Sequence, residues 1–156
     1  MLALLLLSGG APVADIAIVG KQDMVRQSDL IAIVDIQELV STDRARVYVD
    51  LDATGQIARV LKGEASGEVA FRIPRFFPCA AFDVSTGRHV VFLEYEEGQG
   101  YRGVNWYMSY VYLGGGTATW FDGNGTGVVQ QSPEQVLEDI ETLIRTHGSN
   151  PDSERD

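Results

Sequence analysis

The chain has 156 residues, of which 45% are hydrophobic, enough for one well-formed core and too few for two ordinary domains. Its 22 acidic and 12 basic side chains give a formal net charge of -10. This charge repels the phosphate backbone that a nucleic-acid-binding protein must neutralise. We therefore expect one domain that does not bind nucleic acid.

The first residues have features of an export signal. An apolar run from Leu2 to Leu7 is followed by small residues, and no charged side chain precedes Asp15. The run is far too short to span a membrane. No Lys or Arg precedes it, so a short buried N-terminal strand or helix is the alternative. The predicted division is an export signal over 1–14, one domain over 15–148 and a disordered tail over 149–156.

The first half of the domain reads as a short helical turn over 23–27 followed by strands. The strongly apolar run from Leu30 to Ile36 is rich in β-branched residues and predicts a central strand. Alternating apolar residues then begin at Val47 and resume after Gly55, which predicts one long strand bent at a glycine bulge. This strand ends at Lys62-Gly63. The next strand forms a hairpin with it and ends at Pro74, with its inward-facing residues at Val69, Phe71 and Ile73.

The second half continues with closely spaced strands. Gly87 provides a turn before the strand "HVVFLEY" over 89–95. The alternating segment "VNWYMSYVYL" over 104–113 and "TATWF" over 117–121 predict a hairpin joined by the glycine run 114–116. A short apolar segment follows at Val128-Val129.

The last element is an amphipathic helix with well-marked ends. Ser132 is placed to cap it, Pro133 occupies the first helical position, and Gln135 completes a capping box. Gly148 ends it. One apolar stripe at helical spacing is formed by Val136, Leu137, Ile140, Leu143 and Ile144. About six strands with short connections and one helix indicate a mainly β fold, an antiparallel curled sheet or small barrel that the helix covers.

Two segments carry a resemblance to a known family. "IARVLKGEASGEVAFRI", followed by Cys79 and "VSTGRHVVFLEYEEG", is similar to the netrin-like OB-fold domain shared with tissue inhibitors of metalloproteinases, and most to its uncharacterised bacterial members. The similarity covers roughly residues 29–98. It implies an antiparallel five- to six-stranded OB-like barrel covered by the C-terminal amphipathic helix.

The resemblance implies the fold better than the activity. The eukaryotic inhibitors place the amine and carbonyl of an N-terminal cysteine on the protease zinc, and neither Asp15 nor a nearby residue here is a cysteine. The inhibitors are also held by several disulfides, whereas Cys79 is the only cysteine of this chain. The zinc-chelating N-terminus of the eukaryotic inhibitors therefore cannot be inferred for this chain.

Catalytic chemistry has few candidates. His89 begins a strand and His147 lies in the last turn of the helix, where a cation is favoured on structural grounds. Cys79 and His89 are not placed together by any known signature. The pairs Asp50 with Asp52 and Glu94 with Glu96 can each share one face of a strand, as an acid/base pair would, although an acidic surface gives the same spacing. We predict no catalytic residue.

A metal or cofactor site is also not predicted. "DGNGTG" over 122–127 partly fits a calcium loop, with Asp122, Asn124 and Thr126 at ligand positions. The twelfth position is Pro133 instead of a glutamate, and no helix precedes the loop. A glycine-rich turn is the favoured interpretation.

The aromatic residues provide the candidate binding site. Seven of the 14 aromatic side chains fall between Tyr101 and Phe121. If part of this set is exposed, Tyr107, Trp120, Phe76 and Phe77 form a contact patch for a partner, and the alternative is that they pack in the core.

Three functions remain open. The first is a non-catalytic exported domain that binds an unidentified protein partner, with a loop-mediated protease inhibitor as one version. The second is a small hydrolase built on the strand carboxylates or on Cys79, and the third is a purely structural accessory domain. We favour the first.

Overall fold

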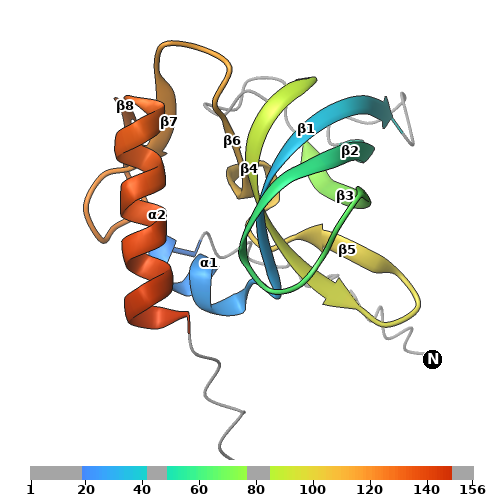
Figure 1. Ribbon diagram of the computed structural model, residues 1–156, viewed down its shortest axis with the longest axis horizontal. Coiled ribbons are helices and arrows are strands. Elements are labelled where there is room, and N and C mark those ends of the chain that lie inside the picture. Colours follow the sequence, from blue (N-terminus) through green and yellow to red (C-terminus); the bar gives the residue numbers. More distant parts are fainter. Residues whose placement is uncertain (1–18, 42–48, 77–84, 149–156) are drawn as a thin grey trace, which may run out of the picture.

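The computed structural model describes residues 19–41, 49–76 and 85–148. This part of the chain is mainly β, with a closed five-stranded barrel, one further strand on its wall, a separate two-stranded sheet and two helices (Figure 1). The elements in chain order are α1 (Lys21–Gln27), β1 (Leu30–Ser41), β2 (Val49–Lys62), β3 (Glu68–Phe76), β4 (Gly87–Glu96), β5 (Gly100–Gly103), the 3-10 turn η1 (Trp106–Ser109), β6 (Tyr110–Tyr112), β7 (Ala118–Phe121), β8 (Val128–Gln131) and α2 (Pro133–His147).

The barrel strands follow the order β1-β2-β3-β5-β4, and β4 pairs back with β1 to close the ring. All these pairings are antiparallel except that of β3 with β5, which is parallel at Phe71 with Tyr101 and at Arg72 with Arg102. Five strands that alternate in direction cannot close without one parallel pair. The predicted β barrel with a C-terminal helix is confirmed, and the expectation of a wholly antiparallel sheet is corrected at this one seam.

Two apolar clusters lie on opposite faces of the barrel wall. Leu30, Ala32, Val34 and Ile36 of β1 point into the barrel, whereas Ile31 and Ile33 belong to an outer cluster that includes side chains of α1, β7 and α2. β4 divides its side chains in the same way. Both strands are therefore buried on both faces, which explains why the sequence from Leu30 to Val34 is apolar without alternation.

The long strand predicted through Gly55 is confirmed as β2, but the bulge predicted at Gly55 lies on β1, where the register skips Gln37. Gly55 lies opposite Ile36 of β1 and Val69 of β3. A Cβ atom here would lie 2.7 Å from the carbonyl oxygen of Asp35 and 2.7 Å from the Cγ1 atom of Val34. Glycine is required because the backbone of β1 lies this close to position 55. The pairing of β1 with β2 shifts register at the same place, and this shift bends the barrel wall toward closure.

Lys62 and Gly63 tie the end of β2 to two other elements. The Lys62 Nζ atom donates hydrogen bonds to the carbonyl oxygens of Val25 (2.8 Å) and Arg26 (3.2 Å), at the C-terminal end of α1. Burial lowers the pKa of Lys62, and the charge of Asp29 opposes this effect. Gly63 has a φ of 83°, and a Cβ atom there would overlap the carbonyl oxygen of Asp29. This Lys-Gly pair thus has a structural role.

The predicted β2–β3 hairpin is confirmed, and Val69, Phe71 and Ile73 face inward as expected. The predicted end at Pro74 is wrong, since β3 continues to Phe76. The ladder shifts register in this region, between the pair of Leu51 with Ile73 and the pair of Val49 with Phe76. Proline is tolerated at such a bulge because no ladder donor is needed there.

The strand predicted over 104–113 is also wrong. The chain turns through η1, and only Tyr110–Tyr112 forms a strand. The buried Asn105 holds this turn, because its amide donates to the carbonyl oxygen of Val19 (2.8 Å) and its Oδ1 atom accepts from the Val19 N–H (3.3 Å). The Asn105 N–H donates to the Ser109 hydroxyl at 2.6 Å, and Trp106 adopts a φ of 52°. Contacts with a distant segment therefore override the local alternation.

The hairpin predicted between 104–113 and 117–121 does not form. β6 pairs with β4, and β7 pairs with β8 in the second sheet. The helix prediction is confirmed: α2 begins with the capping box of Ser132 and Gln135, and it ends at Gly148, whose N–H donates to the carbonyl oxygen of Ile144 at 2.8 Å.

Candidate functional site

Trp120, one of the predicted contact residues, is a core residue. Its side chain has no exposed surface, its ring stacks on Phe92 with centroids 5.7 Å apart, and its indole N–H donates to Asp139 Oδ2 at 2.7 Å. The same carboxylate oxygen lies 2.6 Å from Lys21 Nζ. Asp139 of α2 therefore links this helix to both β7 and α1, and Trp120 is corrected from a partner contact to a buried anchor.

The other three predicted contact residues cannot be placed on a surface. Phe76 lies at the end of β3 and Tyr107 lies in η1, but their side chains are outside the described part of the structure, as is the whole of Phe77. Cys79 and the segments 1–14 and 149–156 also lie outside the described residues.

The candidate acid and base of a hydrolase are not brought together. His89 is fully buried, with its Nδ1 atom 3.1 Å from the carbonyl oxygen of Gly87. It pairs with Val34 on β1, whereas Asp52 pairs with Val40. Six residues of an extended strand separate these positions by about 20 Å. Asp52 also forms an ion pair with Arg72 at 3.2 Å.

The other carboxylates considered for catalysis or metal binding lie among contacts that stabilise the fold. Glu94 and Glu96 both lie near Arg102, at 2.9 and 3.4 Å. In the loop considered for calcium, the Asp122 N–H donates to the carbonyl oxygen of Gly127 at 2.8 Å, which closes the β7–β8 hairpin. Within the described residues, no three or more His, Cys, Asp or Glu side chains are grouped so that they could hold a metal ion.

An aromatic pair with one exposed ring, which sequence reasoning missed, lies at one end of the barrel. Tyr95 of β4 is 58% exposed and faces Tyr101 of β5, with ring centroids 5.3 Å apart and the ring planes at 72°. The backbone of Tyr95 is held by a 2.7 Å hydrogen bond from its N–H to Asp29 Oδ2. Tyr95 shares its face of β4 with Leu93, which points into the barrel, so the tyrosine extends this face beyond the core. The alternation in "FLEYEEGQGY" places Tyr95 on the same face as Leu93, but it does not indicate that the tyrosine lies beyond the core.

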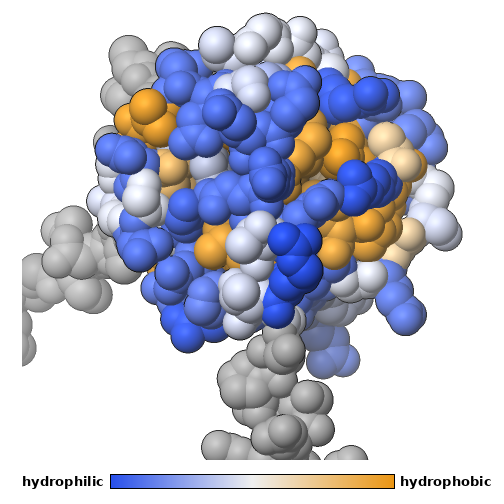
Figure 2. Space-filling model, turned by 60° about the vertical axis from the view of Figure 1, so that its left-hand side comes forward, coloured by the Kyte–Doolittle hydropathy of each residue, from blue (hydrophilic) through white to orange (hydrophobic). Residues whose placement is uncertain are grey.

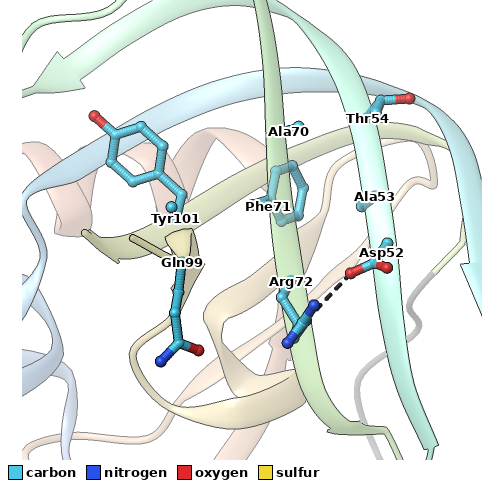
Figure 3. A pocket seen from close by; sticks show the side chains of 9 residues that line it. Asp52, Ala53, Thr54, Ala70, Phe71, Arg72, Gln99 and Tyr101 are labelled. Atoms are coloured by element: carbon cyan, nitrogen blue, oxygen red, sulfur yellow. Dashed lines mark hydrogen bonds and ion pairs between the residues drawn. The ribbon is translucent and has the colours of Figure 1, made fainter. Parts of the chain in front are cut away.

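A hollow of about 270 Å³ adjoins this pair on β2, β3 and the start of β5. Tyr101, Gln99 and Thr54 line it, together with the Asp52–Arg72 ion pair. Figure 3 shows Asp52 and Thr54 on one side of β3, and Gln99 and Tyr101 on the other. We call this feature the β2–β3–β5 hollow. It combines an aromatic ring, an amide, a hydroxyl and a paired charge, groups that fix the orientation of a bound side chain or small ligand.

A second hollow, of about 210 Å³, lies between β2 and α2. An ion pair between Arg59 and Glu141, with atoms 2.5 Å apart, joins two of its walls. Figure 2, which brings the α2 side forward, shows hydrophobic surface interrupted by polar residues. This hollow is the smaller of the two and has no aromatic residue in its lining, so the β2–β3–β5 hollow is the better candidate site.

Comparison with known proteins finds no family model that matches the chain and no match among curated proteins. Neither α1 nor α2, the two helices of the described residues, combines the length and hydrophobicity of a membrane-spanning helix.

Proposed function

We propose that this chain is a non-catalytic binding domain that contacts a protein partner through Tyr95, Tyr101 and the β2–β3–β5 hollow. The supporting observation is the Tyr95 ring, which is 58% exposed while its backbone is fixed by Asp29. A rigidly mounted, exposed tyrosine next to a hollow is typical of a binding hot spot, because it supplies a large contact area at low cost in conformational entropy.

We further propose that the domain is a netrin-like OB-type barrel. The closed strand order β1-β2-β3-β5-β4 supports this assignment. OB-type barrels bind ligands on the face of their second and third strands and through the loop between the fourth and fifth. The hollow is lined by β2, β3 and Gln99 of the β4–β5 connection, which agrees with that location.

Export remains part of the proposal and rests on the apolar run from Leu2 to Leu7. It is tested by expressing the full chain in a bacterial host and determining the N-terminus of the protein outside the cytoplasm. Cleavage near residue 14 supports export, and an intact N-terminus on cytoplasmic protein contradicts it.

The partner is tested by comparing captured proteins between variants. Immobilised wild-type protein, the double variant Tyr95→Ala/Gln99→Ala and the control Val40→Ala are exposed to the exported fraction of the source organism. Val40 is also an exposed apolar residue, but it lies on β1 and not in the lining of the hollow. We expect one protein that wild type and control retain and that the double variant loses.

Loss of a tyrosine hot spot of about 2 kcal/mol weakens binding about thirtyfold, which calorimetry with the purified partner measures. If every captured protein binds the double variant as tightly as wild type, the proposed site is wrong. The protease-inhibitor version requires that the partner be a protease, and titration against a panel of zinc proteases tests it separately.

A further inference from the structure

β8 is an edge strand whose outward backbone groups can be identified. The bond from the Asp122 N–H to the Gly127 carbonyl makes these two residues a hydrogen-bonded pair of the β7–β8 hairpin. Antiparallel ladders alternate between bonded and non-bonded pairs. The backbone N–H and C=O groups of Val129 and Gln131 therefore point to β7, and those of Val128 and Gln130 point away from it.

These outward groups of β8 have no hydrogen-bond partner among the described residues. The side chains of Val128 and Val129 are each 40% exposed. Folded proteins usually protect such an edge by a very short strand, a charge, a proline or a covering segment, because an open edge pairs with any strand that fits. The four residues of β8 limit the length of the edge but leave its outward groups open to a strand of equal length. β8 has the sequence "VVQQ", with neither a charge nor a proline.

The distribution of charge points to the occupant. The chain has a formal net charge of -10, so most surfaces of two copies repel each other. Residues 123–133 contain no charged side chain, and β8 lies within them. We propose that β8 pairs in antiparallel fashion with β8 of a second copy, which joins the two β7–β8 sheets into one four-stranded sheet across the dimer.

The edge is self-complementary in this arrangement. A two-fold axis at Val129 places Val128 of each copy opposite Gln130 of the other, so that the four outward N–H groups donate to the four outward C=O groups. Val129 then faces Val129 of the second copy as a non-bonded pair, the closer type of contact and a favourable one for β-branched side chains. Since the edge is only four residues long, we expect a dimer that dissociates on dilution.

The test is sedimentation equilibrium of the full chain from about 1 µM to about 1 mM. Gln130→Pro removes one outward N–H per copy without touching the β7 ladder, and it weakens dimerisation about thirtyfold. Gln130→Ala is the matched control, because it removes the side-chain bond from Gln130 to the Thr119 hydroxyl but keeps the N–H. We expect Gln130→Ala to dimerise as wild type does.

A charge-swap experiment tests the two-fold axis itself. Val129→Lys and Val129→Glu each place like charges opposite one another in the dimer, so each variant alone dimerises less than wild type. Mixed in equal amounts they pair opposite charges, and we expect association about threefold to tenfold tighter than in either variant alone. Damage to the fold cannot produce this recovery.

The result that overturns the proposal is a wild-type protein that stays monomeric over the whole range, as it would if a strand of another protein or another segment of this chain occupied the edge. Dimerisation that Gln130→Pro and Gln130→Ala affect equally, or a charge-swap mixture without recovery, also overturns it. Tyr95→Ala leaves this dimer unchanged, so the outcome is independent of the proposed partner site.

Discussion

Replacing Gly63 by alanine tests the role of the Lys62-Gly63 pair. Gly63 has a φ of 83°, in the left-handed region, where a non-glycine residue costs about 1–2 kcal/mol. Its new Cβ atom would overlap the carbonyl oxygen of Asp29 and lie 3.2 Å from the carbon of that group. Asp29 cannot move freely, because its N–H donates to the carbonyl oxygen of Leu93 at 2.8 Å and its carboxylate accepts from Tyr95.

The magnitude follows from these contacts. Moving Asp29 away weakens the two hydrogen bonds, which adds about 2–3 kcal/mol to the cost of the left-handed backbone. The smaller entropy of the unfolded alanine chain offsets about 0.4–1 kcal/mol. We expect the Gly63→Ala variant to lose about 3 kcal/mol in free energy of unfolding, or roughly 6–12 °C in Tm for a chain of this size.

Gly67→Ala is the matched control for this variant. Gly67 also has a left-handed φ, 76°, but no atom lies within 4 Å of the position its Cβ would take. It carries only the backbone cost, about 1 kcal/mol after the entropy offset. Urea unfolding followed by circular dichroism measures both variants. Equal losses for the two would refute the argument that close approach to Asp29 requires a glycine at position 63.

Three further predictions concern polar contacts between separate elements of the fold. Tyr110→Phe loses the 3.0 Å hydrogen bond to the Arg72 carbonyl oxygen, so it is about 1 kcal/mol less stable at pH 7. Because burial raises the pKa of Tyr110, the wild-type protein also loses stability as the pH rises above 10. Unfolding curves recorded at alkaline pH should show a smaller loss of stability in the variant. Trp120→Phe leaves Asp139 without its indole donor and costs about 2–4 kcal/mol by urea unfolding, and an unchanged midpoint would contradict the anchoring role. Lys62→Met removes two hydrogen bonds to the end of α1, so amide exchange in α1 should speed up several-fold while exchange in α2 stays unchanged.

Tertiary contacts explain where sequence interpretation was wrong. The alternation over 104–113 has the period of a strand, yet Asn105 binds Val19, 86 residues away, and holds a turn instead. The sequence pattern around an aromatic residue is the same whether the residue packs in a core or forms a contact patch. Trp120 is buried because it packs on Phe92 and donates to Asp139 in the folded structure. The exposed Tyr95 was overlooked because strand alternation does not indicate where a barrel ends.

The sequence by itself determined the features that depend on neighbouring residues. The α2 helix with its capping box, the continuous strand β2 and its end at Lys62-Gly63 could be predicted from adjacent residues, because capping, strand alternation and glycine backbone freedom are local features. The tertiary structure alone decided the parallel seam between β3 and β5, the contact between Lys62 and α1, and the position of the β2–β3–β5 hollow. These features arise where distant segments meet, and the free energy of such contacts depends on burial and closure, which no local pattern encodes.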